Sequence, residues 1–388
     1  MSRLVDIAII GGGVIGSSIA YHLMKRDATL NVVVFEPDPT YCTASSALSA
    51  SSIRQQFSTP LNIAMSRYGM EFLSQATQSP QDEDEPHVGL VERGYLYLAS
   101  AGGRDRLQAN HRIQSDAGVD VALLETGELQ RLFPWLATGD LAAGSLGLSG
   151  EGWFDGYGLL QLFRGRAKKL GAIFRTARVE AVRLTGDHVD ALVLDNGEEV
   201  LCSKVVNAAG PAAASVARMA GIELPVRAEK RSIFVFDCKD GPADMPLVID
   251  PSGVYFRPEG KTFIAGAPAT VGIDSTTLDV DYGLFDEIVW PTLANRVPAF
   301  EAIKLQGAWA GYYEMNLFDH NAIVGKAPNV ENFYLANGFS GHGMQQSPAV
   351  GRGMAELLLA GSYEELDLSP LGYDRILANE PIVELNVI

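Results

Sequence analysis

The feature that most limits how this chain can fold is a glycine-rich turn close to its N-terminus. Residues 4–10 are mostly apolar and β-branched, as expected of a strand that is buried on both faces. Directly after them, Gly11, Gly13 and Gly16 fit the pattern G-x-G-x-x-G. The segment 17–25 then continues with apolar residues at helical spacing. This succession of strand, glycine turn and helix predicts the first unit of a dinucleotide-binding α/β domain.

Each glycine of this pattern has its own physical task. One allows the tight turn, one lets a pyrophosphate approach the backbone, and one lets the helix pack closely on the strand. Unpaired N–H groups and partial positive charge at the helix N-terminus would bind the phosphates. A second apolar strand, 30–35, ends in Glu36, whose carboxylate would accept hydrogen bonds from a ribose and disfavour a 2′-phosphate. The pattern predicts an FAD or NAD site without choosing between them.

Composition excludes several other classes of protein. The 388 residues carry a net charge of −17, which disfavours nucleic acids and anionic membranes as partners. Cys42, Cys202 and Cys238 form no CxxC motif, so we expect a reducing compartment and no metal site. Asp6 and the glycines interrupt the N-terminal apolar run, and no stretch of about 18 apolar residues follows, so neither a signal peptide nor a membrane anchor is predicted. We expect a cytoplasmic protein that does not insert into membranes.

Hydrophobic periodicity places further elements along the chain. An amphipathic helix is predicted over 57–76, with Leu61, Ala64, Met65, Tyr68 and Phe72 on one face. Further helices are predicted at 103–117, at 126–132 and from about Gly158. Strands are predicted at 89–100, as a group of three joined by two tight turns over 178–200, and in β-rich segments at 231–237, 253–268 and 305–316. A strand followed by a helix is predicted over 204–221, and a strand, a glycine loop and a helix over 333–361.

The order of these elements predicts two interleaved domains in an α/β (α+β) fold. Pieces of the dinucleotide-binding type occur at the start, in the middle and at the end of the chain. The predicted Rossmann-type domain comprises 1–78, 150–225 and 318–388. The predicted substrate-binding domain, with a mixed antiparallel β-sheet, comprises 79–149 and 226–317.

Several longer motifs resemble a known family. VVNAAGPAA (205–213), WAGYYEMN (309–316) and FSGHGMQQSPAVG (339–351) are similar to segments of the D-amino-acid-oxidase/sarcosine-oxidase superfamily of FAD enzymes. The resemblance extends over almost the whole chain. It is strongest to the branch of the mitochondrial FAD-dependent oxidoreductase linked to complex I assembly, with the β subunits of dye-linked proline dehydrogenases and sarcosine dehydrogenases nearby. It implies that the Rossmann-type domain binds FAD.

The resemblance also implies how FAD is held. A helix that begins near Met344 would point its N-terminus at the flavin and stabilise negative charge on the reduced ring. Gly311 occupies the position of the cysteine that attaches flavin in monomeric sarcosine oxidases, and no histidine lies between His22 and His87, so FAD should be bound non-covalently. His342 is either a cofactor contact or a packing residue. The residues expected to contact FAD are Gly11, Gly13, Val14, Ile15, Gly16, Glu36, Pro37, Ser45, Ser46, Ser51, Ser52, Val179, Ala208, Gly210, Gly338, Gly341, His342, Gly343, Met344 and Gln345.

Four residues are the candidates for the substrate site. Arg54 matches an arginine that binds the substrate carboxylate in sarcosine-oxidase-like enzymes, for which a bidentate guanidinium is well suited. The alternative for Arg54 is an ordinary surface ion pair. Tyr255 and Tyr313 match positions on the substrate side of the flavin, although either could be a core aromatic residue. Gln345 replaces a basic substrate contact of the sarcosine oxidases.

Departures from the better-known relatives narrow the expected reaction. Ile264 replaces the lysine with which sarcosine oxidases activate oxygen, which favours a dehydrogenase over an oxidase. Tyr313 replaces the carboxylate-binding arginine of glycine and D-amino-acid oxidases, which disfavours their substrates. The expected function is FAD-dependent oxidation of a secondary or N-substituted amine or amino acid, sarcosine-like or proline-like, by hydride transfer to flavin N5, with hydrolysis of the imine product.

Two other functions stay open. The chain could oxidise 2-hydroxy acids, or it could be a weakly catalytic FAD-containing assembly or interaction protein. The expected electron acceptor is O2, a quinone or a partner electron carrier, and partner subunits are possible because the proline and sarcosine dehydrogenase relatives work in assemblies.

Overall fold

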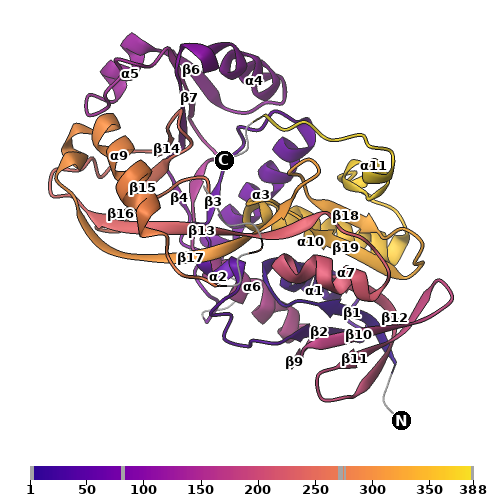
Figure 1. Cartoon of the computed structure of the whole chain (residues 1–388). Coiled ribbons are helices and arrows are strands. Elements are labelled where there is room, and N and C mark those ends of the chain that lie inside the picture. The colour runs from indigo at the N-terminus through magenta and orange to yellow at the C-terminus, as the bar shows by residue number, and fades with distance from the viewer. Residues whose placement is uncertain (1–3, 80–83, 270–273, 275–276, 386–388) are drawn as a thin grey trace.

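A computed structural model of the chain describes residues 4–79, 84–269, 274 and 277–385. Its strands form two eight-stranded sheets and one small three-stranded sheet. In Figure 1 the first sheet lies at the lower right, around β1 (Val5–Ile10) and β12 (Glu199–Asn207). The second lies to the left, around β13 (Val226–Asp237) and β16 (Thr262–Gly266).

The centre of the first sheet is parallel. Its strands follow the order β19–β12–β1–β2–β9, in which β2 is Val32–Glu36, β9 is Ile173–Thr176 and β19 is Phe333–Asn337. β11 (His188–Leu194) pairs antiparallel with the start of β12, and β10 (Val179–Thr185) pairs antiparallel with β11. β18 (Ile323–Lys326) pairs antiparallel with β19. The apolar run in β1 follows from its central position, because a parallel sheet is covered on both faces.

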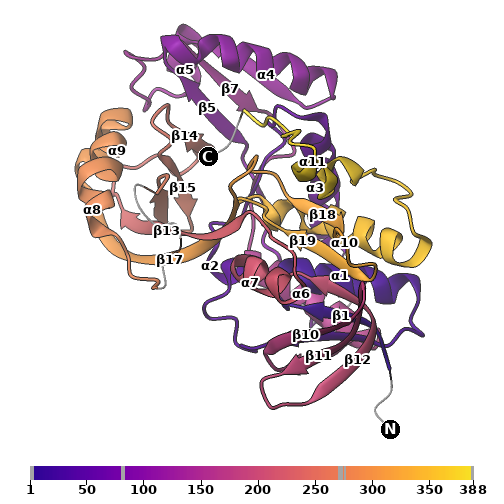
Figure 2. The same ribbon diagram turned by 45° about the vertical axis from the view of Figure 1, so that its right-hand side comes forward.

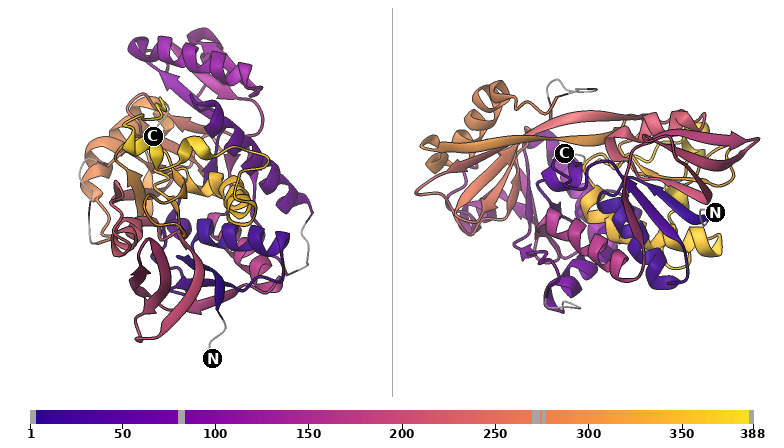
Figure 3. Two further views of the ribbon diagram at one scale, coloured as in Figure 1. Left: turned by 90° about the vertical axis from the view of Figure 1, so that its right-hand side faces the viewer. Right: turned by 90° about the horizontal axis from the view of Figure 1, so that it is seen from below.

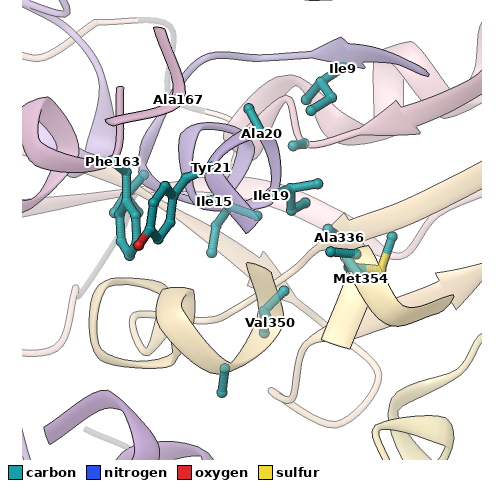
Figure 4. Close-up of a cluster of buried hydrophobic side chains, with 14 of the residues drawn as sticks. Ile9, Ile15, Ile19, Ala20, Tyr21, Phe163, Ala167, Ala336, Val350 and Met354 are labelled. Carbon is teal, nitrogen blue, oxygen red and sulfur yellow. The ribbon is translucent and has the colours of Figure 1, made fainter. Parts of the chain in front are cut away.

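Helices cover both faces of this sheet. On one face, Ile7 and Ile9 of β1 pack in a core formed with α1 (Val14–Arg26), α3 (Pro60–Gln78), α6 (Gly156–Lys169) and α10 (Gly343–Ala360). Figure 4 shows Ile9, Ile19, Val350 and Met354 gathered in this core. On the other face, Ala8 and Ile10 pack with α7 (Ala213–Met219).

The second sheet is formed by the strands that are β-rich in sequence. Its order is β17–β13–β16–β15–β14–β5–β7–β6, with β5 at Tyr95–Ala99, β6 at Val121–Glu125, β7 at Ala143–Gly147, β14 at Leu247–Ile249, β15 at Tyr255–Glu259 and β17 at Lys304–Asn316. Phe234, Phe256 and Phe263 pack on one face against α9 (Trp290–Arg296). Seen from below in Figure 3, β13 and β17 form a long ribbon that reaches from this sheet toward the first.

Shorter elements complete the fold. They are the helices α2 (Ser45–Leu48), α4 (Arg104–Asp116), α5 (Thr126–Leu132), α8 (Tyr282–Leu284) and α11 (Asp374–Leu377), and the small sheet of β3 (Ser52–Ile53), β8 (Gly152–Trp153) and β4 (Val91–Glu92). In Figure 2, α4 and α5 lie at the top, at the end of the molecule opposite the β10–β12 hairpins. Within the described residues, the helices are too short or too polar to cross a lipid bilayer.

Most predicted elements are present, with two local differences. The helix predicted over 57–76 begins at Pro60, and its most deeply buried residues include Met65, Ser66 and Gly69 rather than the whole predicted stripe. The strand predicted over 89–100 is divided into β4 and β5 at Gly94, whose φ of +77° ends the first strand. The strands of the two large sheets come from interleaved segments of the chain, while the domain boundaries stay a prediction.

Gly69 tests the close packing of α3 on α10. A Cβ at this position would lie 2.2 Å from the carbonyl oxygen of Gln345, so we expect Gly69→Ala to destabilise the protein by about 1–3 kcal/mol. Gly165 in α6 has open space where a Cβ would lie, so Gly165→Ala should stabilise by about 0.5–1 kcal/mol. Thermal unfolding of both variants measures the difference. Equal unfolding temperatures would show that the helices are not in this contact.

Candidate active site

A cavity of about 460 Å³ lies between the end of β1 and the ribbon of β13 and β17. One part is lined by the glycine turn and Glu36, and the other by Tyr255 and Tyr313. Its volume is in the range of small-molecule and cofactor sites. One continuous space therefore contains both the predicted dinucleotide cradle and part of the predicted substrate wall.

The glycine turn leaves no room for side chains. Gly11 has a φ of +101°, and a Cβ there would lie 2.3 Å from the carbonyl oxygen of Ala208. A Cβ on Gly16 would lie 2.0 Å from the carbonyl oxygen of Gly11, so this residue serves the packing of α1 on β1. Gly13 lines the cavity at the start of α1. This backbone arrangement fits a pyrophosphate at the N-terminus of α1.

Glu36 lies at the end of β2 and lines the same cavity. Its Oε2 accepts a hydrogen bond from Gly12 N at 2.9 Å, and its Oε1 accepts one from Asp38 N at 2.9 Å. Burial raises the pKa of Glu36, and these hydrogen bonds partly oppose the shift. Each carboxylate oxygen has a second lone pair, so Glu36 could accept hydrogen bonds from ribose hydroxyls without giving up its backbone contacts.

Two serines of α2 complete this end of the cavity. The hydroxyl oxygen of Ser46 accepts a hydrogen bond from Val14 N at 3.0 Å, which fixes α2 against the start of α1. The hydroxyl of Ser45 is buried in the cavity wall and has no hydrogen-bond partner among the described residues. Because buried polar groups are usually hydrogen-bonded, this hydroxyl indicates a polar ligand in the cavity. The residues present therefore fit a bound dinucleotide.

The glycine loop before α10 closes the other side of the cavity. Gly338, Ser340 and Gly341 have φ angles of +70°, +50° and +91°, so three of four successive residues adopt the left-handed region. A Cβ on Gly341 would lie 2.4 Å from the ring of Tyr313, which explains why this position needs glycine. α10 begins at Gly343, one residue before the predicted start, and Gly343 and Met344 line the cavity.

Glu314, which is not among the predicted site residues, holds this loop in place. Its Oε2 accepts a hydrogen bond from Gly338 N at 3.0 Å, and its backbone oxygen accepts one from Ser340 N at 3.1 Å. Burial raises the pKa of the Glu314 carboxyl to about 8, against the hydrogen bonds from Gly338 and Phe339, which lower it. The side chain is therefore mostly protonated at neutral pH while it lines the cavity.

The predicted wall residues Tyr255 and Tyr313 come from two strands, and a third strand adds Arg231. Tyr255 lies on β15, Tyr313 on β17, and Arg231 on β13 is in register with Gly311. All four line the cavity. Burial raises the pKa of Tyr255, which keeps its hydroxyl as a neutral donor. Arg231 was not predicted; a charged residue next to an apolar β segment was the signal that could have identified it.

Arg54 lies outside the lining of the cavity, and its side chain is only 2% exposed. Its Nη1 donates to the carbonyl oxygen of Gln56 at 2.8 Å, and its guanidinium lies 4.0 Å from the centroid of the Phe57 ring. Its Nη2 lies 3.0 Å from Nε2 of His342. Burial and the positive charge of Arg54 hold the pKa of His342 well below its usual value, so neutral Nε2 can accept this hydrogen bond.

Gln345 has a structural contact instead of an open amide. Its Oε1 accepts hydrogen bonds from Arg54 N and from the hydroxyl of Ser66, both at 2.9 Å. The structure thus brings Arg54, His342 and Gln345 together, but as a buried cluster separate from the tyrosine wall. The His342 ring contacts the Phe57 ring edge-on.

The predicted site residues therefore divide into two groups. Those that line the cavity are Gly11, Gly13, Val14, Ile15, Glu36, Pro37, Ser45, Ser46, Val179, Ala208, Gly210, Tyr255, Tyr313, Gly341, Gly343 and Met344. Those that lie outside its lining are Gly16, Ser51, Ser52, Arg54, Gly338, His342 and Gln345. Members of the second group have structural contacts: Ser51 donates through its hydroxyl to Ser49 O, and Gly338 donates to Glu314.

Glu36 provides a test of the dinucleotide cradle. Glu36→Gln removes the negative charge and one acceptor oxygen next to the expected ribose, so we expect the Kd for FAD to rise about tenfold. Equilibrium dialysis of the apoprotein against FAD measures this change. Glu71→Gln, at an exposed position of α3, is the control and should bind FAD like the wild type. An unchanged Kd for Glu36→Gln would contradict the assignment.

Glu314 predicts a pH dependence of stability. The folded state raises its pKa from 4.5 to about 8, so the unfolded chain releases this proton at lower pH than the folded chain does. The contribution of Glu314 to the free energy of unfolding is complete below about pH 4.5 and is lost as the pH rises to about 8. Over this range the free energy of unfolding falls by up to about 1.4 kcal/mol per pH unit. Glu314→Gln should lose less stability over this range. Urea unfolding of the holoprotein at several pH values measures it, with exposed Glu301→Gln as the control; an unchanged slope would contradict the assignment.

Comparison with known proteins agrees with this geometry. FAD-dependent oxidoreductase domain-containing protein 1 of Xenopus laevis is 42% identical over 422 residues, which cover 99% of this chain and 85% of that protein. Human mitochondrial sarcosine dehydrogenase is 26% identical over 388 residues, which cover 95% of this chain but 41% of that protein. L-proline dehydrogenase from P. horikoshii superposes with a TM-score of 0.88 at 25% identity, covering 98% of this chain and 100% of that chain.

The expected resemblance, the α/β (α+β) fold class and the FAD cofactor are thereby confirmed. The model of the DAO family, described as "FAD dependent oxidoreductase", matches residues 6–357. This range includes both large sheets and the cavity between them. The chain belongs to the DAO family of FAD-dependent oxidoreductases.

Proposed function

We propose that this protein oxidises a secondary or N-substituted amino acid, of the sarcosine or proline type, as a dehydrogenase. The observation that supports it most is the single cavity in which the dinucleotide cradle and the Tyr255–Tyr313 wall face the same space. The similarity to a sarcosine dehydrogenase and to an L-proline dehydrogenase favours the same class of substrate.

The chemistry divides between cofactor and protein. FAD, when bound, accepts hydride from the carbon next to the substrate nitrogen. The protein has to bind the amine in its neutral form, orient it and exclude water. Tyr255 keeps its proton because burial raises the pKa of its phenol, so it can donate a hydrogen bond to the ligand. Tyr313 packs directly on Gly341, which fixes the wall relative to the glycine loop.

The prediction that Arg54 binds the substrate carboxylate is subject to a structural condition. Its guanidinium would have to exchange its contacts with the Gln56 carbonyl and His342 to reach a ligand in the cavity. As it stands, Arg54 supports the start of α10, which carries Gln345, because its backbone N–H donates to Gln345 Oε1.

The preference for a dehydrogenase rests on Ile264. This residue is 1% exposed in β16, in register with Val235 and Arg257. An apolar side chain gives no electrostatic help to the formation of superoxide. Arg231 also lines the cavity, but it lies on β13 and not at the position of Ile264, and Glu229 Oε1, 2.6 Å from its Nε, weakens its positive charge there without cancelling it. We therefore infer that a quinone or a partner electron carrier accepts the electrons more readily than O2 does.

Anaerobic bleaching of the bound flavin tests this function. We expect sarcosine or L-proline to bleach the holoprotein, and glycine, D-alanine and lactate to do so slowly or not at all, with free FAD as the control. Tyr255→Phe should slow the bleaching, whereas Tyr282→Phe, at an exposed position of α8, should not.

The other outcomes have definite meanings. Bleaching by lactate but by none of the amines would replace this proposal with oxidation of 2-hydroxy acids. A flavin that no substrate of the panel bleaches would contradict a catalytic role and favour an assembly function. Reoxidation by O2 as fast as by a quinone would contradict the dehydrogenase assignment.

A further inference from the structure

Arg231 introduces a positive charge into the wall of the candidate active site. It lies on β13 in register with Gly311 of β17, and both residues line the cavity. Its guanidinium carbon lies 5.0 Å from the centroid of the Tyr313 ring, which packs against Gly341 on the glycine loop. Residues directly paired across antiparallel strands share a face of the sheet. The Arg231 side chain therefore projects from the face on which Gly311 borders the cavity.

Glu229 holds this guanidinium without satisfying it. Glu229 and Arg231 lie two positions apart on β13, so their side chains project from the same face of the sheet. Both side chains are largely buried: Arg231 is 14% exposed and Glu229 is 12% exposed. Arg231 Nε lies 2.6 Å from Glu229 Oε1, but the contact is an ion pair and not an aligned hydrogen bond. Nη1 donates to the carbonyl oxygen of Ala267 at 3.5 Å. A guanidinium has five N–H donors, so capacity for a further acceptor remains.

The surroundings of Arg231 suit an anionic ligand with a planar acceptor group. The neighbouring lining residues Ile233, Tyr255 and Gly311 are uncharged. Glu314 also lines the cavity, but burial raises the pKa of its carboxyl to about 8, so at neutral pH it does not compete as an anion. A guanidinium binds a carboxylate with two parallel hydrogen bonds, and it does so most strongly where water is excluded.

We propose that Arg231, held by Glu229 and seated against Tyr313, binds the carboxylate of the substrate. This inference rests on the proposed function, because it assigns the group that recognises the acid within the same cavity. It makes the enzyme specific for amino acids over simple amines. It also assigns the carboxylate to β13 and not to Arg54, whose guanidinium lies outside the cavity lining.

Binding of propionate and of its neutral isostere propionamide tests the proposal without turnover. Titration of the holoprotein with each compound, followed by the visible absorption of bound FAD, gives a Kd for both. Arg231→Gln should weaken propionate binding about tenfold or more and leave propionamide binding unchanged. Arg231→Lys, which keeps the charge but loses the bidentate geometry, should lie between. The control is Arg227→Gln, which should bind propionate like the wild type. Arg227 lies on the same strand but outside the cavity lining, and its Nε lies 3.7 Å from Asp274 Oδ2.

Glu229→Gln separates a binding role from a merely structural one. Glu229→Gln removes the negative charge next to Arg231, so it should tighten propionate binding. If the Arg231–Glu229 ion pair only stabilised β13, both Arg231→Gln and Glu229→Gln would weaken propionate binding. FAD content and unfolding temperature are measured alongside, so that a misfolded variant is recognised. Weaker propionate binding in Glu229→Gln would therefore overturn the proposal.

Three further results would also overturn it. They are unchanged propionate binding in Arg231→Gln, loss of propionate binding only in Arg54→Gln, and a wild-type protein whose flavin spectrum does not respond to propionate. The proposed function can fail separately: if no substrate bleaches the flavin but propionate binding depends on Arg231, the anion site stands and the assigned reaction is wrong.

Discussion

The close approach of α1 to the end of β1 is the contact on which the rest of the structure depends. A Cβ on Gly16 would lie 2.0 Å from the Gly11 carbonyl oxygen, so only glycine allows the helix to begin there. This position directs the N-terminus of α1 into the cavity next to Glu36. It also sets α1 against α10, where the hydroxyl of Ser18 donates to the Ser347 carbonyl at 2.7 Å and a Cβ on Gly351 would lie 2.1 Å from Ser18 Oγ. One backbone contact near the N-terminus thus determines where the last long helix lies.

The second sheet meets this arrangement through the end of β17. Glu314 accepts from Gly338 N, and Asn316 N donates to the hydroxyl of Ser340 at 3.0 Å, so the ribbon of β13 and β17 is fastened to the glycine loop. The left-handed backbone of this loop is costly for Ser340 and persists because these hydrogen bonds hold it. The same ribbon brings Arg231 and Tyr313 to the cavity, where they meet Tyr255 of β15. The cofactor side and the substrate side are therefore coupled by a few hydrogen bonds.

The fold and half of the site could be predicted because their signals are local. The glycine turn, Glu36 and the segment before α10 each lie within a short stretch whose spacing defines its backbone. Arg231 and Glu314 could not be identified in this way, because their meaning depends on the pairing of β13 with β17 and on a loop more than twenty residues away. For Arg54 the resemblance predicted a ligand of the substrate carboxylate. Burial against Phe57 and His342, which depends on side-chain packing, places its guanidinium outside the cavity lining.

The position of β19 in the first sheet has a consequence for how the protein is made. β19 pairs with β12, and α10, which follows it, covers α1, although more than three hundred residues separate α1 from α10 in the chain. On a ribosome, which delivers the chain from its N-terminus, the cradle for FAD forms early, yet one edge of β12 and one face of α1 wait for the last segment. Until that segment emerges, these surfaces are exposed and need protection from other chains.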